Sequence, residues 1–102
     1  MEYDTFVRHN IPIISVIGND GCWSQIYRDQ TEVFKSDAGC MLAHNDYHKI
    51  SEALGATGFV VDSEAQLTDT FQQAKQQAKE GKPVVINAFI GQTDFRKGSI
   101  SV

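Results

Sequence analysis

The chain has 102 residues and a formal net charge of −4, with 41% hydrophobic and 22% charged residues. A chain of this length forms one domain at most, and its mild acidity offers no polybasic surface for nucleic acid or anionic lipid. We therefore expect no nucleic-acid partner.

Sorting signals and disulfides are not evident in the sequence. No apolar run is long enough to cross a bilayer, and the first ten residues lack the basic-then-apolar order of a secretory signal. We expect the chain as given to be soluble, with no membrane contact and no targeting signal. Cys22 and Cys40 are too far apart for a CxxC pair, so both are interpreted as reduced thiols.

The first half of the chain predicts a helix, a strand and a long loop. Residues 1–10 have the apolar spacing of a helix, and Ile11–Ile17 has the near-continuous apolar character of a parallel strand covered on both faces. This strand is predicted to end in a tight polar turn, Gly18–Gly21. A short helix over Trp23–Arg28 and a loop over Thr31–Asn45 are expected next.

A second helix and strand follow the loop. Asp46 is a favourable N-cap for a helix that ends at Gly55, and Thr57–Val61 is predicted to be the second strand. The side of this helix predicted to be apolar carries Tyr47, Ile50, Ala53 and Leu54.

The last helix and strand have the clearest pattern. Ser63 and Gln66 form a capping box, Gly81 ends the helix, and Pro83–Ile90 is predicted to be the third strand. The predicted inward stripe of this helix is Leu67, Phe71, Ala74 and Ala78.

Strands that alternate with helices favour right-handed crossovers and a parallel sheet. The predicted fold class is therefore α/β, with three layers and a parallel sheet. Three parallel strands leave two open edges, which is typical of part of a larger domain. Residues 91–102 are interpreted as a polar C-terminal tail that Phe95 and Ile100 anchor.

The polar turn after the first strand is the strongest candidate site, because ligands of α/β sheets bind where strands end. Asn19 supplies an amide oxygen and Asp20 a carboxylate, while the glycines let the backbone approach a ligand closely. Oxygen ligands of this kind suit magnesium bound together with substrate phosphates. Asn-Asp-Gly is also ordinary turn chemistry, so the residues alone leave both interpretations open.

The stretch IPIISVIGNDGCW resembles the second half of the thiamine diphosphate motif, in which a strand ending in Asn-Asn or Asn-Asp-Gly follows a Gly-Asp-Gly by some tens of residues. The segments EYDTFVRHNIPI, DYHKISEALGATGFVV and GKPVVINAFIG are similar to the neighbouring segments of acetolactate synthases and their relatives. The chain is thereby identified as a member of the acetolactate synthase and 2-hydroxyacyl-CoA lyase family. The resemblance implies that residues 1–102 are the C-terminal part of its diphosphate-binding domain.

The resemblance also implies a magnesium and thiamine diphosphate site. Asn19 would ligate magnesium through its side chain and Gly21 through its carbonyl, with the backbone of Cys22 and Trp23 beside the cofactor. Asp20 would be a turn residue and not a ligand. The Gly-Asp-Gly half and the activating glutamate are absent from this chain, so none of its residues is expected to be catalytic and the isolated chain is expected to be inactive.

The activity that the resemblance implies is cleavage of a 2-hydroxyacyl-CoA to formyl-CoA and an aldehyde one carbon shorter. The alternative within the family is an acetolactate synthase acting on pyruvate, a 2-keto acid. The alternative outside it is a non-catalytic, truncated α/β module. The parent enzyme is expected to be a homo-oligomer, in the endoplasmic reticulum membrane if it is animal and otherwise in the cytoplasm.

The remaining polar and apolar candidates carry weaker signals. The three histidines have no zinc or triad spacing, and His48 is predicted on the exposed side of its helix. Cys22 is interpreted as a packing residue because no paired base is identifiable. Trp23 can line a channel or seal the sheet end, and Phe34 and Met41 can contact an acyl chain or anchor their loop.

Overall fold

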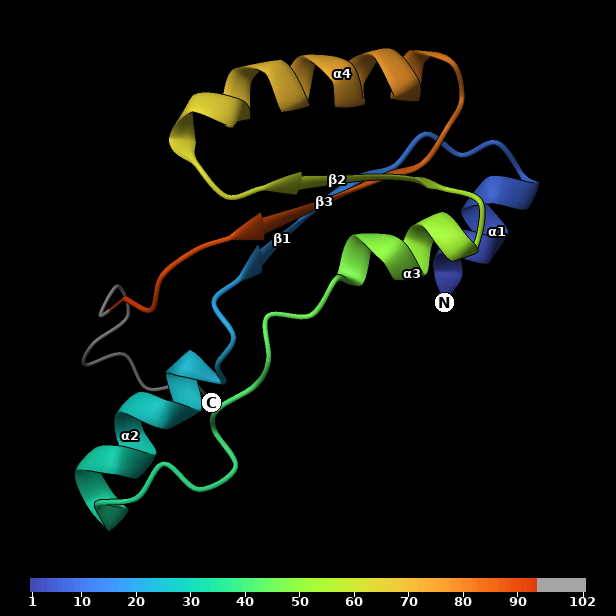
Figure 1. Ribbon diagram of the computed structural model, residues 1–102. Helices are drawn as coiled ribbons and strands as arrows, with labels where there is room; N and C mark the ends of the chain where they lie inside the picture. Colours follow the sequence, from blue (N-terminus) through green and yellow to red (C-terminus); the bar gives the residue numbers. More distant parts are fainter. Residues whose placement is uncertain (94–102) are drawn as a thin grey trace. The chain divides into compact units, whose positions relative to one another are not determined.

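The computed structural model describes residues 1–93. In chain order its elements are α1 (Glu2–Arg8), β1 (Ile14–Asn19), α2 (Ser24–Phe34), α3 (Tyr47–Ala53), β2 (Thr57–Val61), the 3-10 turn η1 (Glu64–Gln66), α4 (Leu67–Lys79) and β3 (Val84–Phe89) (Figure 1). The chain divides into two compact units: a sheet unit, residues 1–18 and 46–89, and a loop unit, residues 19–45 with those from 90 onward. The predicted anchors Phe95 and Ile100 lie outside the described residues.

The sheet has the strand order β1-β3-β2, with β3 in the centre. β2 and β3 are parallel, with Thr57 opposite Val84. On the other side of β3, the Val84 N–H donates to the Ile13 carbonyl (2.7 Å) and the Ile90 N–H donates to the Asn19 carbonyl (3.0 Å). Both bonds have the same sequence offset, so β1 also runs parallel to β3, and the predicted parallel α/β sheet is confirmed.

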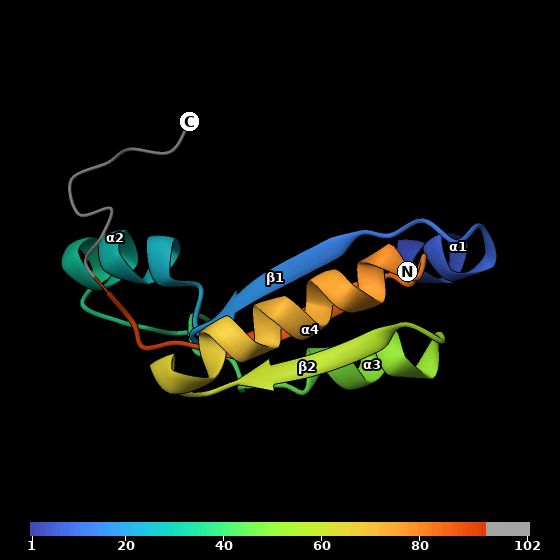
Figure 2. The ribbon, with the colours of Figure 1, turned by 90° about the horizontal axis from the view of Figure 1, so that it is seen from above.

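Helices cover both faces of the sheet, as the three-layer prediction required. α4 lies on one face, and α1 and α3 lie on the other (Figures 1 and 2). The core between α4 and the sheet consists of Val61, Ala74, Val84 and Ile86. β3 is buried over its first four residues because a strand flanks it on each side and helices cover it above and below.

The first strand and the helix after it differ from the prediction in their bounds. β1 begins at Ile14 and includes Gly18 and Asn19, so the polar turn starts two residues later than predicted, at Asp20. It is an edge strand, and its Val16 is 51% exposed, so among the described residues it is not covered on both faces. α2 continues past Arg28 to Phe34, because its sequence has no glycine or proline to end it before Lys35 takes a left-handed conformation with φ of 54°.

The inward face of α3 is not the predicted one. His48 and Ser51 are buried, whereas Ile50 is 57% exposed, so the prediction that His48 is exposed is wrong. The predicted apolar side instead lines an open apolar pocket of about 180 Å³ in the sheet unit, formed by Met1, Tyr3, Ile17, Tyr47, Ile50, Ser51, Leu54 and Val85.

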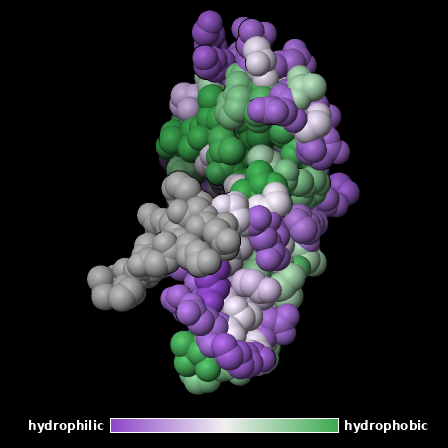
Figure 3. Space-filling model, turned by 90° about the vertical axis from the view of Figure 1, so that its left-hand side faces the viewer, coloured by the Kyte–Doolittle hydropathy of each residue, from purple (hydrophilic) through white to green (hydrophobic). Residues whose placement is uncertain are grey.

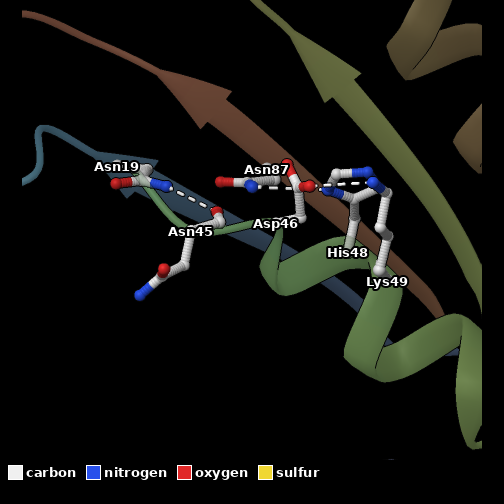
Figure 4. A network of polar contacts seen from close by, with 6 residues as sticks. All are labelled: Asn19, Asn45, Asp46, His48, Lys49 and Asn87. Atoms are coloured by element: carbon white, nitrogen blue, oxygen red, sulfur yellow. Dashed lines mark hydrogen bonds and ion pairs between the residues drawn. The ribbon is translucent and has the colours of Figure 1, made fainter. Parts of the chain in front are cut away.

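Two of the predicted helix caps form different bonds. Asp46 occupies the N-cap position of α3 without a side-chain capping bond, and its carboxylate pairs with Lys49 Nζ at 2.8 Å (Figure 4). The hydrogen bond and charge of Lys49 lower the pKa of Asp46. Ser63 also makes no capping bond, and Gln66 Oε1 instead accepts the Asp62 N–H at 2.9 Å. The predicted start of the helix is a 3-10 turn, Glu64–Gln66, and the α-helix begins at Leu67.

α4 buries Thr70 and Ala74, while Phe71, predicted to face inward, is 36% exposed. Gly81, with a φ of +82°, follows the C-cap residue Glu80 and ends the helix, as predicted. Among residues 1–93 no helix combines the length and apolar character that a bilayer crossing requires.

Candidate functional site

The turn after β1 is held by the side chain of Asp20. Its Oδ1 accepts the backbone N–H of Cys22 at 3.2 Å, and its Oδ2 accepts the hydroxyl of Ser24, the first residue of α2. The carboxylate therefore closes an Asx turn and fixes the start of α2. This arrangement occupies both oxygens of Asp20 with protein donors.

Gly21, in the turn between β1 and α2, has a left-handed backbone conformation with a φ of +66°. A Cβ at this position would lie 2.7 Å from His44 Cε1 and 2.8 Å from His44 Nδ1, so the imidazole packs directly against the glycine. The Gly21 carbonyl accepts the Leu42 N–H at 2.7 Å. Only glycine fits here, because both the left-handed backbone and the nearby ring exclude a side chain.

Cys22 and Trp23 pair with a later segment of the chain that contains Cys40 and Met41. Cys22 pairs with Met41 in an antiparallel bridge, and the Trp23 N–H donates to the Cys40 carbonyl at 2.8 Å. Both thiols are free and buried, as interpreted from the sequence. Burial raises the pKa of Cys40, and the nearby Cys22 and Asp37 raise it further. The Trp23 side chain is 59% exposed.

Asn19, the last residue of β1, is 5% exposed and has a defined side-chain orientation. Its Nδ2 donates to the Asn45 carbonyl at 3.1 Å. Figure 4 shows that Oδ1 lies on the far side of the amide from Asn45. The hydrogen bond to the Asn45 carbonyl therefore orients the Asn19 amide so that its Oδ1, the acceptor atom, points away from Asn45.

These oxygens fit the magnesium site that the resemblance implies. The Asn19 amide oxygen and the Gly21 carbonyl are hard oxygen ligands two residues apart, and a carbonyl oxygen that accepts one hydrogen bond retains a second lone pair. Within residues 1–93 no group of three or more His, Cys, Asp or Glu side chains can hold a metal ion. A magnesium ion at Asn19 and Gly21 would therefore depend on water and phosphate oxygens for its other ligands.

The sequence missed two polar features. In the sheet unit, Asn87 is fully buried in the middle of β3, with its Nδ2 3.4 Å from Nδ1 of His48, which is 8% exposed (Figure 4). An asparagine inside the apolar run PVVINAFI is the signal that could have found this pair, because a buried amide needs a partner.

The second missed feature is a polar pocket in the loop unit. Arg28, in the middle of α2, donates from a terminal guanidinium nitrogen to the Thr93 carbonyl at 2.6 Å. The pocket has a volume of about 180 Å³ and is lined by Ser24, Tyr27, Arg28, Gln92 and Thr93. Nothing in the spacing of these residues pointed to it, because Gln92 and Thr93 lie more than sixty residues along the chain from Arg28.

Comparison with known proteins places the chain in a family. The family described as "Thiamine pyrophosphate enzyme, C-terminal TPP binding domain" matches residues 1–88. The 2-hydroxyacyl-CoA lyase 2 of Danio rerio is 47% identical over 99% of this chain and 17% of its own length, and that of Homo sapiens is 47% identical over 100% and 16%. The acetolactate synthase large subunit IlvG of Mycobacterium tuberculosis is 33% identical over 85% of this chain and 16% of its own length.

The chain thus spans 16–17% of the length of these relatives. The match to the family covers β1, the Asp20–Gly21 turn, all four helices and most of β3. The chain belongs to the thiamine pyrophosphate enzymes, as part of their C-terminal TPP-binding domain.

Proposed function

We propose that residues 19–23 form one corner of a magnesium and thiamine diphosphate site in a carbon–carbon lyase that cleaves 2-hydroxyacyl-CoA. The observation that carries the site is the fixed orientation of Asn19, whose Nδ2 is engaged by the Asn45 carbonyl. A buried amide held in this way is preorganised, so binding a metal ion costs little side-chain entropy.

Each residue of the corner has a separate task in this proposal. Asn19 binds magnesium through Oδ1 and Gly21 binds it through its carbonyl, while His44 keeps the Gly21 backbone in place by packing against it. The backbone of Cys22 and Trp23 lies beside the cofactor diphosphate. When bound, thiamine diphosphate supplies the group that stabilises a carbanion, and the protein supplies binding and orientation.

The substrate class is inferred from the relatives. The 2-hydroxyacyl-CoA lyase 2 proteins match nearly the whole chain at 47% identity, and this supports a 2-hydroxyacyl-CoA substrate for the parent enzyme. The alternative is an acetolactate synthase activity on pyruvate, which the 33% identity to the mycobacterial enzyme supports less strongly. In both cases the parent enzyme would be a homo-oligomer that completes the site.

The test is calorimetric titration of thiamine diphosphate into the chain, with magnesium and with a chelator. Asn19→Ala removes the proposed side-chain ligand, and Gln72→Ala is the matched control, because it removes an exposed amide from α4. We expect magnesium-dependent heat in the wild type and in Gln72→Ala, and binding at least ~10-fold weaker in Asn19→Ala, the loss of about 1.4 kcal/mol. Equal magnesium-dependent heat in both variants would remove Asn19 from the ligand set. No heat in any sample would contradict a site formed by this chain alone.

A further inference from the structure

The polar pocket of the loop unit has the chemistry of an anion site. The side chains that line it within residues 1–93 all carry hydrogen-bonding groups, and among these the guanidinium of Arg28 is charged. Its volume of about 180 Å³ is ample for a carboxylate or a phosphate group, since about 10–15 Å³ measured in this way already holds one water molecule.

Arg28 differs from the other arginine that the structure describes. Arg8 forms an ion pair with Asp4 at 3.1 Å on the surface of α1. Arg28 is half-buried, and within residues 1–93 no carboxylate pairs with it. Among residues 1–93, it donates a hydrogen bond to the Thr93 carbonyl, which uses one of the five N–H donors that a guanidinium carries. Arg28 therefore brings a permanent positive charge and further donors to the pocket that it lines.

The neighbouring groups favour an anion over a cation. Ser24 donates its hydroxyl proton to Asp20, whose carboxylate also accepts the Cys22 N–H, so the carboxylate bonded to this lining residue is already satisfied by two donors. The Tyr27 hydroxyl and the Gln92 amide add neutral donors to the charged ones of Arg28. Charge-assisted hydrogen bonds to a carboxylate or phosphate are the strongest that such a set can form.

We propose that this Arg28 pocket, formed by Ser24, Tyr27, Arg28, Gln92 and Thr93, binds an anionic oxygen group of the substrate, either a carboxylate or a phosphate. The choice of sources rests on the proposed function: a 2-keto acid brings a carboxylate, and a coenzyme A thioester brings phosphates. The anion site itself rests only on the pocket and its charge.

The experiment is an NMR titration of the ¹⁵N-labelled chain that follows the Arg28 Nε–H and the backbone amides of Tyr27 and Thr93. The probes are sodium pyruvate and adenosine 3′,5′-bisphosphate, each compared with sodium chloride at the same ionic strength. We expect one probe to shift these signals with saturation. Saturation by pyruvate alone assigns a carboxylate, and saturation by the bisphosphate alone assigns a phosphate. Shifts no larger than those in sodium chloride for both probes would overturn the proposal.

Four variants separate recognition from folding. Arg28→Gln should weaken binding at least ~10-fold, Arg28→Lys should weaken it less because the charge remains, and Tyr27→Phe should weaken it several-fold by removing one hydroxyl. Arg8→Gln is the matched control and should leave binding unchanged, since that arginine already has a carboxylate partner. Unchanged binding in Arg28→Gln, with the circular dichroism spectrum of the wild type, would overturn the proposal.

The failure of this proposal can be distinguished from failure of the thiamine diphosphate site. Arg28→Gln should retain magnesium-dependent binding of thiamine diphosphate, and Asn19→Ala should retain binding of the anionic probe. Saturable binding of a probe by a chain that does not bind the cofactor would support the Arg28 pocket and contradict the cofactor proposal alone.

Discussion

At the scale of single residues, a glycine can be required by its backbone conformation or by the lack of space for a side chain, and a comparison of Gly21 with Gly39 distinguishes the two. Both lie in the loop unit with positive φ, +66° at Gly21 and +78° at Gly39. A Cβ at Gly39 would meet nothing within 4 Å, whereas a Cβ at Gly21 would meet the His44 ring at 2.7 Å. Gly39 is therefore favoured by its backbone conformation only, whereas Gly21 is favoured both by its backbone conformation and by the lack of space for a Cβ beside His44.

We predict that Gly21→Ala destabilises the chain more than Gly39→Ala does. Each substitution should cost about 1–2 kcal/mol for the left-handed backbone, and Gly21→Ala should cost at least ~1 kcal/mol more because the His44 ring must move. Urea unfolding measures both values. In the Gly21→Ala/His44→Ala double variant the extra cost should be recovered and the conformational cost should remain. Equal costs for the two single variants would show that His44 does not restrict Gly21.

At the scale of elements, the contact between α3 and β3 depends on a buried polar pair. Asn87 in β3 is fully buried, and His48 on the inward face of α3 lies 3.4 Å from it. Polar groups without water must be paired, so the pair fixes which face of α3 meets the strand. This explains why His48 faces inward while the larger apolar Ile50 remains 57% exposed.

We predict strong coupling between these two positions. Asn87→Leu and His48→Phe should each cost about 1–3 kcal/mol, because each removes the contact between these two buried polar side chains. The double variant loses that same contact only once, so it should cost less than the sum by at least ~1 kcal/mol in urea unfolding. Additive costs would indicate that the two side chains do not depend on each other.

The matched control is the exposed Asp46–Lys49 pair on the same helix. Its coupling should be smaller and should vanish in concentrated salt. Because Lys49 lowers the pKa of Asp46, that coupling is present above the pKa of an unfolded aspartate, about 3.9, and is lost as the pH falls through the folded pKa. The coupling of the buried Asn87–His48 pair should persist in salt.

The elements that the sequence predicts well are those whose signals are local. β2 has its predicted bounds, β3 lies within one residue of them at each end, and Gly81 follows α4 as expected. The features that were placed wrongly have different causes. The inward face of α3 is decided by its packing against β3, which periodicity does not reveal, whereas α2 runs past its predicted end because no glycine or proline stops it before Lys35.

The candidate site was predictable in part for the same reason. A strand followed by Asn-Asp-Gly locates Asn19 and Gly21. The residue types alone show that these two positions carry an amide oxygen and a backbone carbonyl oxygen. The orientation of the Asn19 amide depends on Asn45, and the space over Gly21 depends on His44, each more than twenty residues away in the chain. The Arg28 pocket combines α2 with residues 92 and 93, so no local pattern contains it.

At the scale of the whole molecule, the two units have different amounts of buried apolar surface. The sheet unit has a core of fully or nearly fully buried side chains around β3. α2, the longest element of the described loop unit, has no buried residue, and its last two residues, Val33 and Phe34, are 68% and 75% exposed. Figure 3 shows green, apolar surface at the lower end of the view. Stability in a protein follows buried contacts, so the two units should open with different free energies.

We predict that hydrogen exchange is slowest in β3 and faster in α2 by ~100-fold or more, a difference of about 2.7 kcal/mol or more in opening free energy. The amides of β3 donate within a sheet that is covered on both faces, while those of α2 open without exposing a core. Mass spectrometry of peptides from residues 20–34 and 82–90, normalised to the rates of the unfolded chain, measures the ratio.

Ile86→Ala tests the origin of that difference. Ile86 is fully buried in the core, and its truncation typically costs 2–5 kcal/mol, so exchange in β3 should accelerate by at least ~30-fold as global unfolding becomes easier. Exchange in α2 should stay the same, because its amides exchange through a local opening that leaves the core of the sheet unit intact. Equal acceleration in both peptides would mean that the loop unit and the sheet unit unfold as one cooperative body.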